Sequence, residues 1–214
     1  MNWRKCVSRF KTLSNISPKV MGNLDRGLVF VLSAPAGTGK TTLTQMICQE
    51  FEGKVYESIS CTTRSKRAYE QNNVHYHFIS EDEFIEKIEN DEFIEHVHVF
   101  DHYYGTLKSE IESKISNGSH VILVIDTHGA MKIKEKLDAI YIFVAPPSIQ
   151  ELERRLKLRQ TETEEMIQKR LKHAEVELTF SDQYDYFIIN QDLQVAYQVF
   201  KSIIISEEHR NRSR

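Results

Sequence analysis

The sequence predicts an α/β fold with three layers, in which helices cover both faces of a parallel core sheet. Two observations predict it. From residue 28 onward, short β-branched runs alternate with amphipathic helical stretches. The clearest runs are almost continuously apolar, as strands covered on both faces are, and they lie at residues 28–33, 120–126, 139–145 and 185–189.

The composition is that of one soluble globular domain. The chain has 214 residues and a net charge of −3, which gives no overall attraction to nucleic acid or to an anionic membrane. Its longest apolar runs are far too short to cross a bilayer. The three cysteines lack C-x-x-C spacing, which favours a reducing compartment over a disulfide framework or a zinc site. We therefore expect a cytoplasmic protein without a nucleic-acid or membrane partner.

The two ends differ from the rest of the chain. Residues 1–24 contain Lys and Arg but no acid, because the first acid is Asp25. We expect residues 1–26 to form a disordered basic extension. An organelle transit peptide shares this acid-poor, Ser-bearing composition and is the alternative. Residues 207–214 are expected to form a polar C-terminal tail.

The stretch that follows the first strand has the pattern of a phosphate-binding loop. Gly37, Thr38 and Gly39 let the backbone curl so that its N–H groups point at phosphate oxygens. Lys40 then reaches the β- and γ-phosphates, the Thr41 hydroxyl suits Mg²⁺, and the helix that follows directs its N-terminus at the same anion. The predicted nucleotide-binding residues here are Ala34, Pro35, Ala36, Gly37, Thr38, Gly39, Lys40, Thr41 and Thr42.

Ala34 stands where this motif has its first glycine. Alanine is compatible with the position if φ stays negative, so we expect an intact site. The order strand, loop, helix is the context that the motif requires. It predicts a P-loop NTPase fold but does not separate kinases from GTPases and motor ATPases.

Two segments interrupt the alternation of strands and helices. Residues 60–104 carry short strand-like pieces around one helix at 81–90, which begins with the capping box Ser80–Glu83. The charged stretch at 154–165 separates a helix that begins with Ser148 and Glu151 from the next one. Two inserts around a phosphate loop indicate an enzyme that closes over its substrates.

The elements after the insert carry their own boundary signals. Asn117-Gly118 ends a helix that begins near Leu107. A long helix is predicted from about Thr163 to Phe180. Its expected apolar stripe consists of Met166, Ile167, Leu171, Ala174 and Leu178.

Several stretches together resemble guanylate kinases: "SAPAGTGKTT", "SCTTRSKR", "HYHF", "EFIEH" with "YYGT", "RRLKLRQTETEEMIQKRL" and "IIN". The resemblance covers roughly residues 27–206, in the order and spacing of the family, where "SAP" commonly opens the loop. It implies a core at 27–59, 105–153 and 171–206, a GMP-binding insert at 60–104 and a mobile lid at 154–170.

The resemblance implies an acceptor site in the insert. Arg64 and Arg67 would hold the phosphate of GMP as bidentate forks, helped by the hydroxyls of Tyr76 and Tyr104. Guanine presents two adjacent N–H donors that one carboxylate, Glu95, can accept. Without the resemblance, we would interpret the arginines as part of a solvated basic face and Glu95 as a strand residue that faces solvent. The remaining members of the expected GMP set are Ser60, Thr106, Glu70 and Asp126.

The lid would supply further positive charge. Arg155 and Arg159 lie four residues apart on one helical face, and Arg170 follows in the next helix. Closure would bring them to the transferring phosphate as catalytic residues alongside Lys40. Pairing with nearby glutamates on the surface is the alternative, and it is compatible with an open state. Asn190 matches the family position near the donor adenine.

The implied activity is phosphorylation of GMP, and of dGMP, by ATP with Mg²⁺, through direct in-line transfer. The alternatives are a catalytically weak or inactive guanylate-kinase-like binding module and a P-loop kinase for another monophosphate. A monomer or a weak homo-oligomer is expected. The pairs His75/His77 and His96/His98 could share strand faces and bind a metal, but we favour polar positions on half-exposed strands, because the phosphate and base contacts already account for the insert.

Three departures from the family pattern stand out. Val124 replaces the first acid of Asp-x-Asp, so only Asp126 remains of that pair. Leu158 and Gln160 replace the glycines of the lid, which predicts a stiffer hinge. Tyr69 precedes Glu70 where the family has glycine. We expect reduced turnover or an altered acceptor, not loss of activity.

Overall fold

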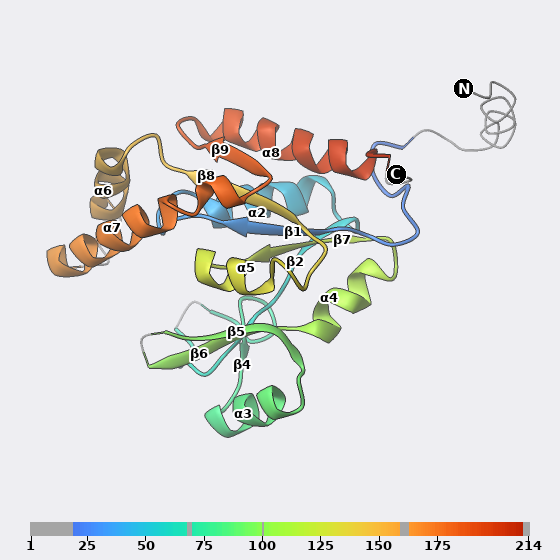
Figure 1. Ribbon diagram of the computed structural model, residues 1–214, viewed down its shortest axis with the longest axis horizontal. Helices are drawn as coiled ribbons and strands as arrows, with labels where there is room; N and C mark the ends of the chain where they lie inside the picture. The colour runs from blue at the N-terminus through green and yellow to red at the C-terminus, as the bar shows by residue number, and fades with distance from the viewer. Residues whose placement is uncertain (1–18, 68–69, 100, 159–162, 212–214) are drawn as a thin grey trace, which may run out of the picture.

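The core of the protein is a parallel sheet. The computed structural model describes residues 19–67, 70–99, 101–158 and 163–211. Within them, five strands pair in the order β2-β7-β1-β8-β9, and every pair is parallel (Figure 1). The predicted parallel α/β core is therefore confirmed. The strands are β1 (Val29–Ser33), β2 (Val55–Glu57), β7 (His120–Val124), β8 (Ile140–Ala145) and β9 (Tyr186–Ile189).

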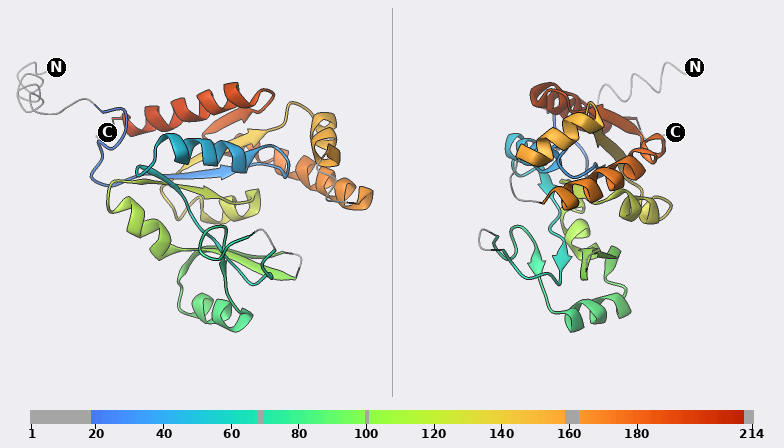
Figure 2. Two further views of the ribbon diagram at one scale, coloured as in Figure 1. Left: turned by 180° about the vertical axis from the view of Figure 1, so that it is seen from behind. Right: turned by 90° about the vertical axis from the view of Figure 1, so that its left-hand side faces the viewer.

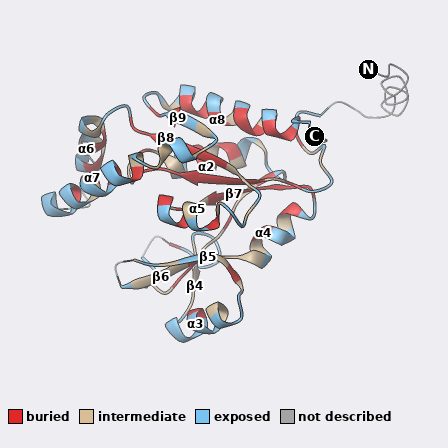
Figure 3. Cartoon of the chain, in the orientation of Figure 1, coloured by how far each residue is buried: buried red, intermediate tan, exposed pale blue. Residues whose placement is uncertain are grey.

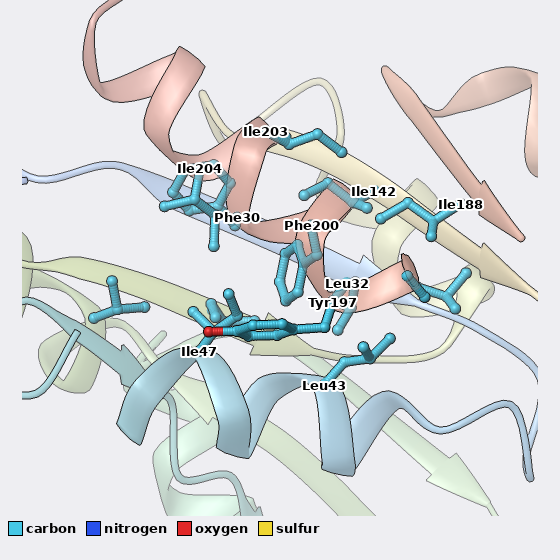
Figure 4. Close-up of a cluster of buried hydrophobic side chains, with 14 of the residues drawn as sticks. Phe30, Leu32, Leu43, Ile47, Ile142, Ile188, Tyr197, Phe200, Ile203 and Ile204 are labelled. Atoms are coloured by element: carbon cyan, nitrogen blue, oxygen red, sulfur yellow. The ribbon is translucent and has the colours of Figure 1, made fainter. Parts of the chain in front are cut away.

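Alternating side chains of β1 fill the two halves of the core. Phe30 and Leu32 pack with helices α2 (Lys40–Glu50) and α8 (Leu193–Glu208) on one face (Figures 1 and 4). Val29 and Val31 pack with α4 (Lys108–Ile115) and α5 (Thr127–Ile133) on the other (Figure 2). Burying each such side chain contributes about 1.5–3 kcal/mol. Burial on both faces of the sheet (Figure 3) makes β1 a rigid support for the loop that follows it.

Strand β7 is shorter than the apolar run at 120–126 predicts. The strand ends at Val124, and Asp126 serves as the N-cap of α5, where its Oδ1 accepts a hydrogen bond from Gly129 N at 2.7 Å. A side chain that caps a helix needs an extended backbone outside the strand ladder. The Asp126 carboxylate thus follows the end of β7, at the carboxyl-terminal end of the core sheet.

The insert forms a second sheet of its own. Its four strands pair in the order β4-β3-β6-β5, with β3 and β4 parallel and the other pairs antiparallel. Phe84 and Phe93 stack with ring centroids 4.4 Å apart in its small core. The Ser80 hydroxyl accepts from Glu83 N at 3.1 Å, as the capping box predicts. The elements are β3 (Cys61–Thr62), β4 (His77–Phe78), α3 (Glu81–Glu89), β5 (Phe93–Val99) and β6 (His102–Leu107).

Helices α6 (Ile149–Leu158) and α7 (Glu164–Leu178) lie beyond the end of β8 and pack on each other through a separate apolar cluster (Figure 1). The prediction for the stripe of α7 was wrong at Met166, which is 47% exposed. Residues 167, 171 and 174 follow the spacing of one helical face, and residue 166 points about 100° away from it. Glu177, three residues beyond Ala174, is buried on that face instead.

The first described residues are fixed to the end of α8. Buried Glu208 accepts from Asn23 N at 2.5 Å, and its other oxygen lies 2.5 Å from Nε2 of His120. Leu28 N donates to Nδ1 of His120, so the neutral ring carries its proton on Nε2 and donates it to Glu208. Nε2 of His209 lies 3.1 Å from the carbonyl oxygen of Val20. The disordered extension was predicted for residues 1–26; residues 1–18 lie outside the described residues, whereas residues 19–26 are described and make specific contacts, such as that of Asn23 with Glu208.

The helices of the described part of the chain are all too short or too polar to cross a membrane.

Candidate active site

The phosphate loop connects the end of β1 to the start of α2. Gly37 and Gly39 have φ of 93° and 98°, a region that other residues rarely adopt. The Thr38 hydroxyl donates to the Pro35 carbonyl at 2.8 Å and closes the loop from inside. Among the described non-glycine residues, positive φ occurs only at Asn73, Asp91 and Asp101, so Ala34 replaces the expected glycine without backbone strain.

The start of α2 is suited to an anion. Gly39 caps the helix and offers no side chain to compete for its first N–H groups. The first turn consists of Lys40, Thr41, Thr42 and Leu43, so no carboxylate repels a phosphate there. The Lys40 ammonium donates to the carbonyl of Ala34, which holds the side chain back over the loop. Thr41 and Thr42 are exposed beside it.

A cavity of about 260 Å³ lies between the insert and the end of β7. It brings together side chains from β5, β6 and the core, including five of the residues predicted to bind the acceptor. Val124, the departure from Asp-x-Asp, lines the same cavity and makes that part of its wall apolar. The lining residues are Ser60, Tyr76, Glu95, Val97, Val99, Tyr104, Val124, Ile125 and Asp126.

Two carboxylates converge in this cavity. A Cβ placed on Gly129 would lie 3.3 Å from both Glu95 Oε2 and Asp126 Oδ1, so the absence of a side chain lets them share this space. Glu95 is 8% exposed, and burial raises its pKa to about 7, with a further contribution from the charge of Asp126. The Thr106 hydroxyl donates to Glu95 Oε1 at 2.9 Å and lies 3.3 Å from Ser60 Oγ.

Arg64 is held in place beside the cavity. Its guanidinium forms two hydrogen bonds with Glu70, at 3.0 and 2.8 Å, and lies 5.6 Å from the centroid of the Tyr76 ring. Glu70 also accepts from Arg67 N at 2.8 Å, so one buried carboxylate organises the whole turn. The Arg64 hydrogen bonds hold the pKa of Glu70 at about 2. Tyr76 and Tyr104 lie together, with ring centroids 6.1 Å apart.

Helix α6 lies against the phosphate loop, where its Leu152 and Leu156 are next to Gly37. Arg155 of α6 donates to Glu151 at 2.8 Å and to the carbonyl of Asn190 at 2.9 Å. The Asn190 side chain donates to the carbonyl of Thr38 at 2.6 Å. Arg170 is half-buried on α7. Arg159 and Gln160 lie outside the described residues, as does Tyr69.

Glu177 is a candidate residue that the sequence reasoning missed. It is 4% exposed on α7, and burial raises its pKa, whereas the positive charges of Lys40 and His173 act in the opposite direction. His173 Nδ1 lies 3.4 Å from its carboxylate. A glutamate three residues after Ala174 on the apolar stripe was the available signal, because a carboxylate on a buried face needs a charged partner.

Two other features are poor candidates for the site. Gln71 N donates to Nδ1 of His75, and His77 Nδ1 contacts Asn73 Oδ1 at 2.8 Å, which gives both rings structural partners. Within the described residues, His, Cys, Asp and Glu side chains nowhere gather in a group of three that could hold a metal.

A larger cavity of about 1060 Å³ lies at the opposite end of the core sheet. Ligands of open α/β sheets bind at the carboxyl ends of the strands, where the phosphate loop and the smaller cavity lie.

The chain is similar to known proteins over most of its length. The family model described as guanylate kinase matches residues 26–207. A guanylate kinase of Protochlamydia amoebophila is 52% identical over 192 residues, which cover 89% of this chain and 97% of the relative. One of Chlamydia trachomatis serovar D is 46% identical over 182 residues, covering 85% and 89%. The crystal structure of guanylate kinase from Anaplasma phagocytophilum matches with a TM-score of 0.70 and 32% identity, covering 87% of this chain and 88% of that one. The chain belongs to the guanylate kinase family.

Proposed function

We propose that the chain phosphorylates GMP with ATP by direct transfer of the γ-phosphoryl group, and that the residues described above carry this activity. The observation that supports it most is the pair of carboxylates in the cavity beside Arg64, buried Glu95 and half-buried Asp126. A cavity that holds paired carboxylates fits a base with N–H donors, and an arginine fork beside it fits a phosphate.

The donor side rests on the phosphate loop. The loop N–H groups and Lys40 bind the β- and γ-phosphates and stabilise the charge that develops during transfer. The exposed Thr41 hydroxyl is a hard oxygen ligand at the start of α2, so its chemistry fits Mg²⁺. When bound with ATP, Mg²⁺ neutralises phosphate charge. Arg155 and Arg170 reach the same phosphates once α6 and α7 close over the loop, and Asn190 lies at the donor side.

The acceptor side rests on the cavity of the insert. Glu95 accepts the two adjacent N–H groups of guanine, while Thr106 fixes the orientation of its carboxylate. Asp126 takes the remaining donor of the exocyclic amine. Arg64, Arg67 and the hydroxyls of Tyr76 and Tyr104 hold the acceptor phosphate in line with the donor.

ADP release from ATP and Mg²⁺, measured with a coupled assay and GMP, dGMP, AMP or UMP as acceptor, tests this function. Rapid release with GMP and dGMP alone is the expected result. Equal release with another monophosphate would favour a different acceptor, for which the apolar Val124 in the cavity wall provides a reason. Binding of GMP without turnover would favour the inactive binding module.

The affinity for guanine is expected to depend on pH through Glu95. Its pKa of about 7 in the free protein means that part of the population carries a neutral carboxyl at neutral pH. Only the ionised carboxylate accepts both N–H groups, so affinity is full above pH 7 and is lost as the pH falls through 7. Between pH 8 and pH 6 the ionised fraction changes about tenfold.

Calorimetric titration with guanosine at pH 6, 7 and 8 measures this effect. Guanosine has no phosphate, so the protonation of the GMP phosphate near pH 6 does not interfere. An affinity that stays constant over this range would contradict the role of Glu95 or its raised pKa.

Replacing Glu70 by glutamine is expected to raise the KM for GMP about tenfold and to change the KM for ATP little. The substitution removes one of the two acceptor oxygens that hold Arg64 and the charge that orients it. Steady-state kinetics with each substrate varied in turn measures the two KM values. The matched control is Glu89→Gln on the exposed end of α3, and equal effects of the two variants would exclude the positioning role.

A cytoplasmic location and a monomeric or weakly oligomeric state complete the proposal. Free Cys48 and Cys61 in the described residues support a reducing compartment.

A further inference from the structure

Asn190 connects three parts of the donor site. It follows β9 directly and is 4% exposed. Its main-chain N–H donates to the carbonyl of Ala145, at the end of β8, at 2.8 Å. Its main-chain carbonyl accepts from Arg155 of α6 at 2.9 Å. Its side-chain amide donates to the carbonyl of Thr38, inside the phosphate loop, at 2.6 Å.

The contact with the loop is tight and requires glycine. The Asn190 amide nitrogen lies 2.6 Å from the position that a Cβ on Gly39 would occupy, a distance that real Cβ atoms do not show. Gly39 therefore provides both the positive φ of the loop and the space for the Asn190 side chain. Because Thr38 and Gly39 lie immediately before Lys40, the amide fixes the peptide units whose N–H groups point at the phosphates.

The helix α6 presses on the same loop from another direction. A Cβ on Gly37 would lie 3.1 Å from Leu156 and 3.2 Å from Leu152, both buried residues of α6. Arg155, on the same helix, is tied to Asn190. The loop is thus held between α6 and Asn190, and Asn190 is held in turn by α6 and β8.

We propose that Asn190 is a positioning residue for the donor phosphates: its side chain holds the phosphate loop at Thr38, and its main chain links that loop to β8 and to Arg155. This goes beyond the contact with the donor adenine that the family resemblance implies for this residue. It rests on the proposed function only in that the loop binds the phosphates of a nucleotide.

A ligand with phosphates but no base separates the two roles. We expect Asn190→Ala to weaken binding of magnesium tripolyphosphate about tenfold or more, by the loss of a buried hydrogen bond, and to weaken ATP in the same proportion. Calorimetry measures both dissociation constants. A third titration measures the affinity for GMP, which we expect to stay unchanged because the acceptor site remains folded. The control, Asn117→Ala, removes an exposed Asn whose amide donates to the carbonyl of Ser113 at 2.8 Å, and it leaves all three affinities unchanged.

Weaker ATP binding with unchanged tripolyphosphate binding would overturn the proposal in favour of a base contact. A lower Tm with unchanged tripolyphosphate affinity would reduce Asn190 to a stability role. If Asn190→Ala does not fold, the same titrations are made with Asn190→Ser. Independently of either variant, the Asn190 side-chain amide of the unaltered protein should exchange slowly with solvent by NMR, and rapid exchange would contradict the contact.

The outcomes also separate this proposal from the assignment of the reaction. If the unaltered protein binds tripolyphosphate and the Asn190 variants lose that binding, the positioning role stands even where no GMP is phosphorylated. If the unaltered protein phosphorylates GMP and the variants bind tripolyphosphate as it does, the reaction stands and the positioning role is overturned.

Discussion

Replacing Lys40 by methionine is expected to lower kcat for GMP phosphorylation by about 10³-fold or more. The ammonium is held over the phosphate loop by the carbonyl of Ala34, so it is already close to the proposed position of the β- and γ-phosphates. Methionine keeps much of the volume but removes the charge that stabilises the transferring group. Because the contribution of Lys40 grows in the transition state, kcat falls more than ATP affinity.

Coupled ADP release with GMP measures the loss, and calorimetry with GMP shows that the acceptor site survives. The matched control is Lys87→Met on α3, in the insert, where the lysine lies 3.3 Å from Glu92. A Lys40→Met enzyme within a few fold of the unaltered activity would remove the phosphate loop from the mechanism and require a different donor site.

Replacing Glu95 by glutamine is expected to lower kcat/KM for GMP by about 10³-fold or more. The glutamine amide offers one acceptor and places N–H groups against the N–H edge of guanine. It also imitates the protonated carboxyl, so the variant should behave at pH 8 as the unaltered protein does at low pH. Its residual guanosine binding is therefore expected to lose the dependence on pH.

The control for this variant is Glu92→Gln, near the start of β5, where the side chain is 41% exposed and pairs with Lys87. ATP binding, measured separately, should be the same in both variants and in the unaltered protein. If Glu95→Gln retains its kcat/KM for GMP, guanine is recognised by another group, and Asp126 becomes the first to test.

The core of the fold was readable from the sequence because its signals are local. β-Branched runs that are apolar throughout occur where strands are covered on both faces, and the four predicted strands match β1, β7, β8 and β9. Capping also acts within one turn, so Ser80 and Ser148 indicate the starts of α3 and α6 correctly. The end of β7 was wrong by two residues because an apolar run does not reveal where a capping side chain takes over.

The membership of the guanylate kinase family was predicted from its motifs and is confirmed by the comparisons. The roles of the individual residues stay predictions. Contacts that join distant segments were not readable: the amide of Asn190 meets Thr38 across 152 positions of the chain. Likewise, the place of Glu177 on the apolar stripe indicates that it needs a charged partner, but the sequence does not show that Lys40, 137 positions away in the chain, supplies part of that charge.

Val124, which replaces the first acid of the family's Asp-x-Asp pattern, is the last residue of β7. It lines the cavity proposed for the acceptor, together with Glu95 and Asp126. A carboxylate at this position would add a third negative charge and raise the pKa of Glu95 further. The apolar side chain of Val124 avoids this. If this cavity holds the acceptor, Val124 contributes to its choice, and comparison of the activity with different monophosphates is the measurement that tests this.

The contact between His209 and Val20 joins the two ends of the described chain, 3.1 Å apart between Nε2 and the carbonyl oxygen. They meet on the side of the core sheet where β1 begins, away from the phosphate loop (Figure 2). A short linker from residue 211 to residue 19 would close the chain into a ring, and new ends could open at Gly53, where a Cβ would meet no atom within 4 Å. A circular permutant of this kind would contain every element of the site, and we expect it to reach the same architecture because its new ends lie in an exposed turn.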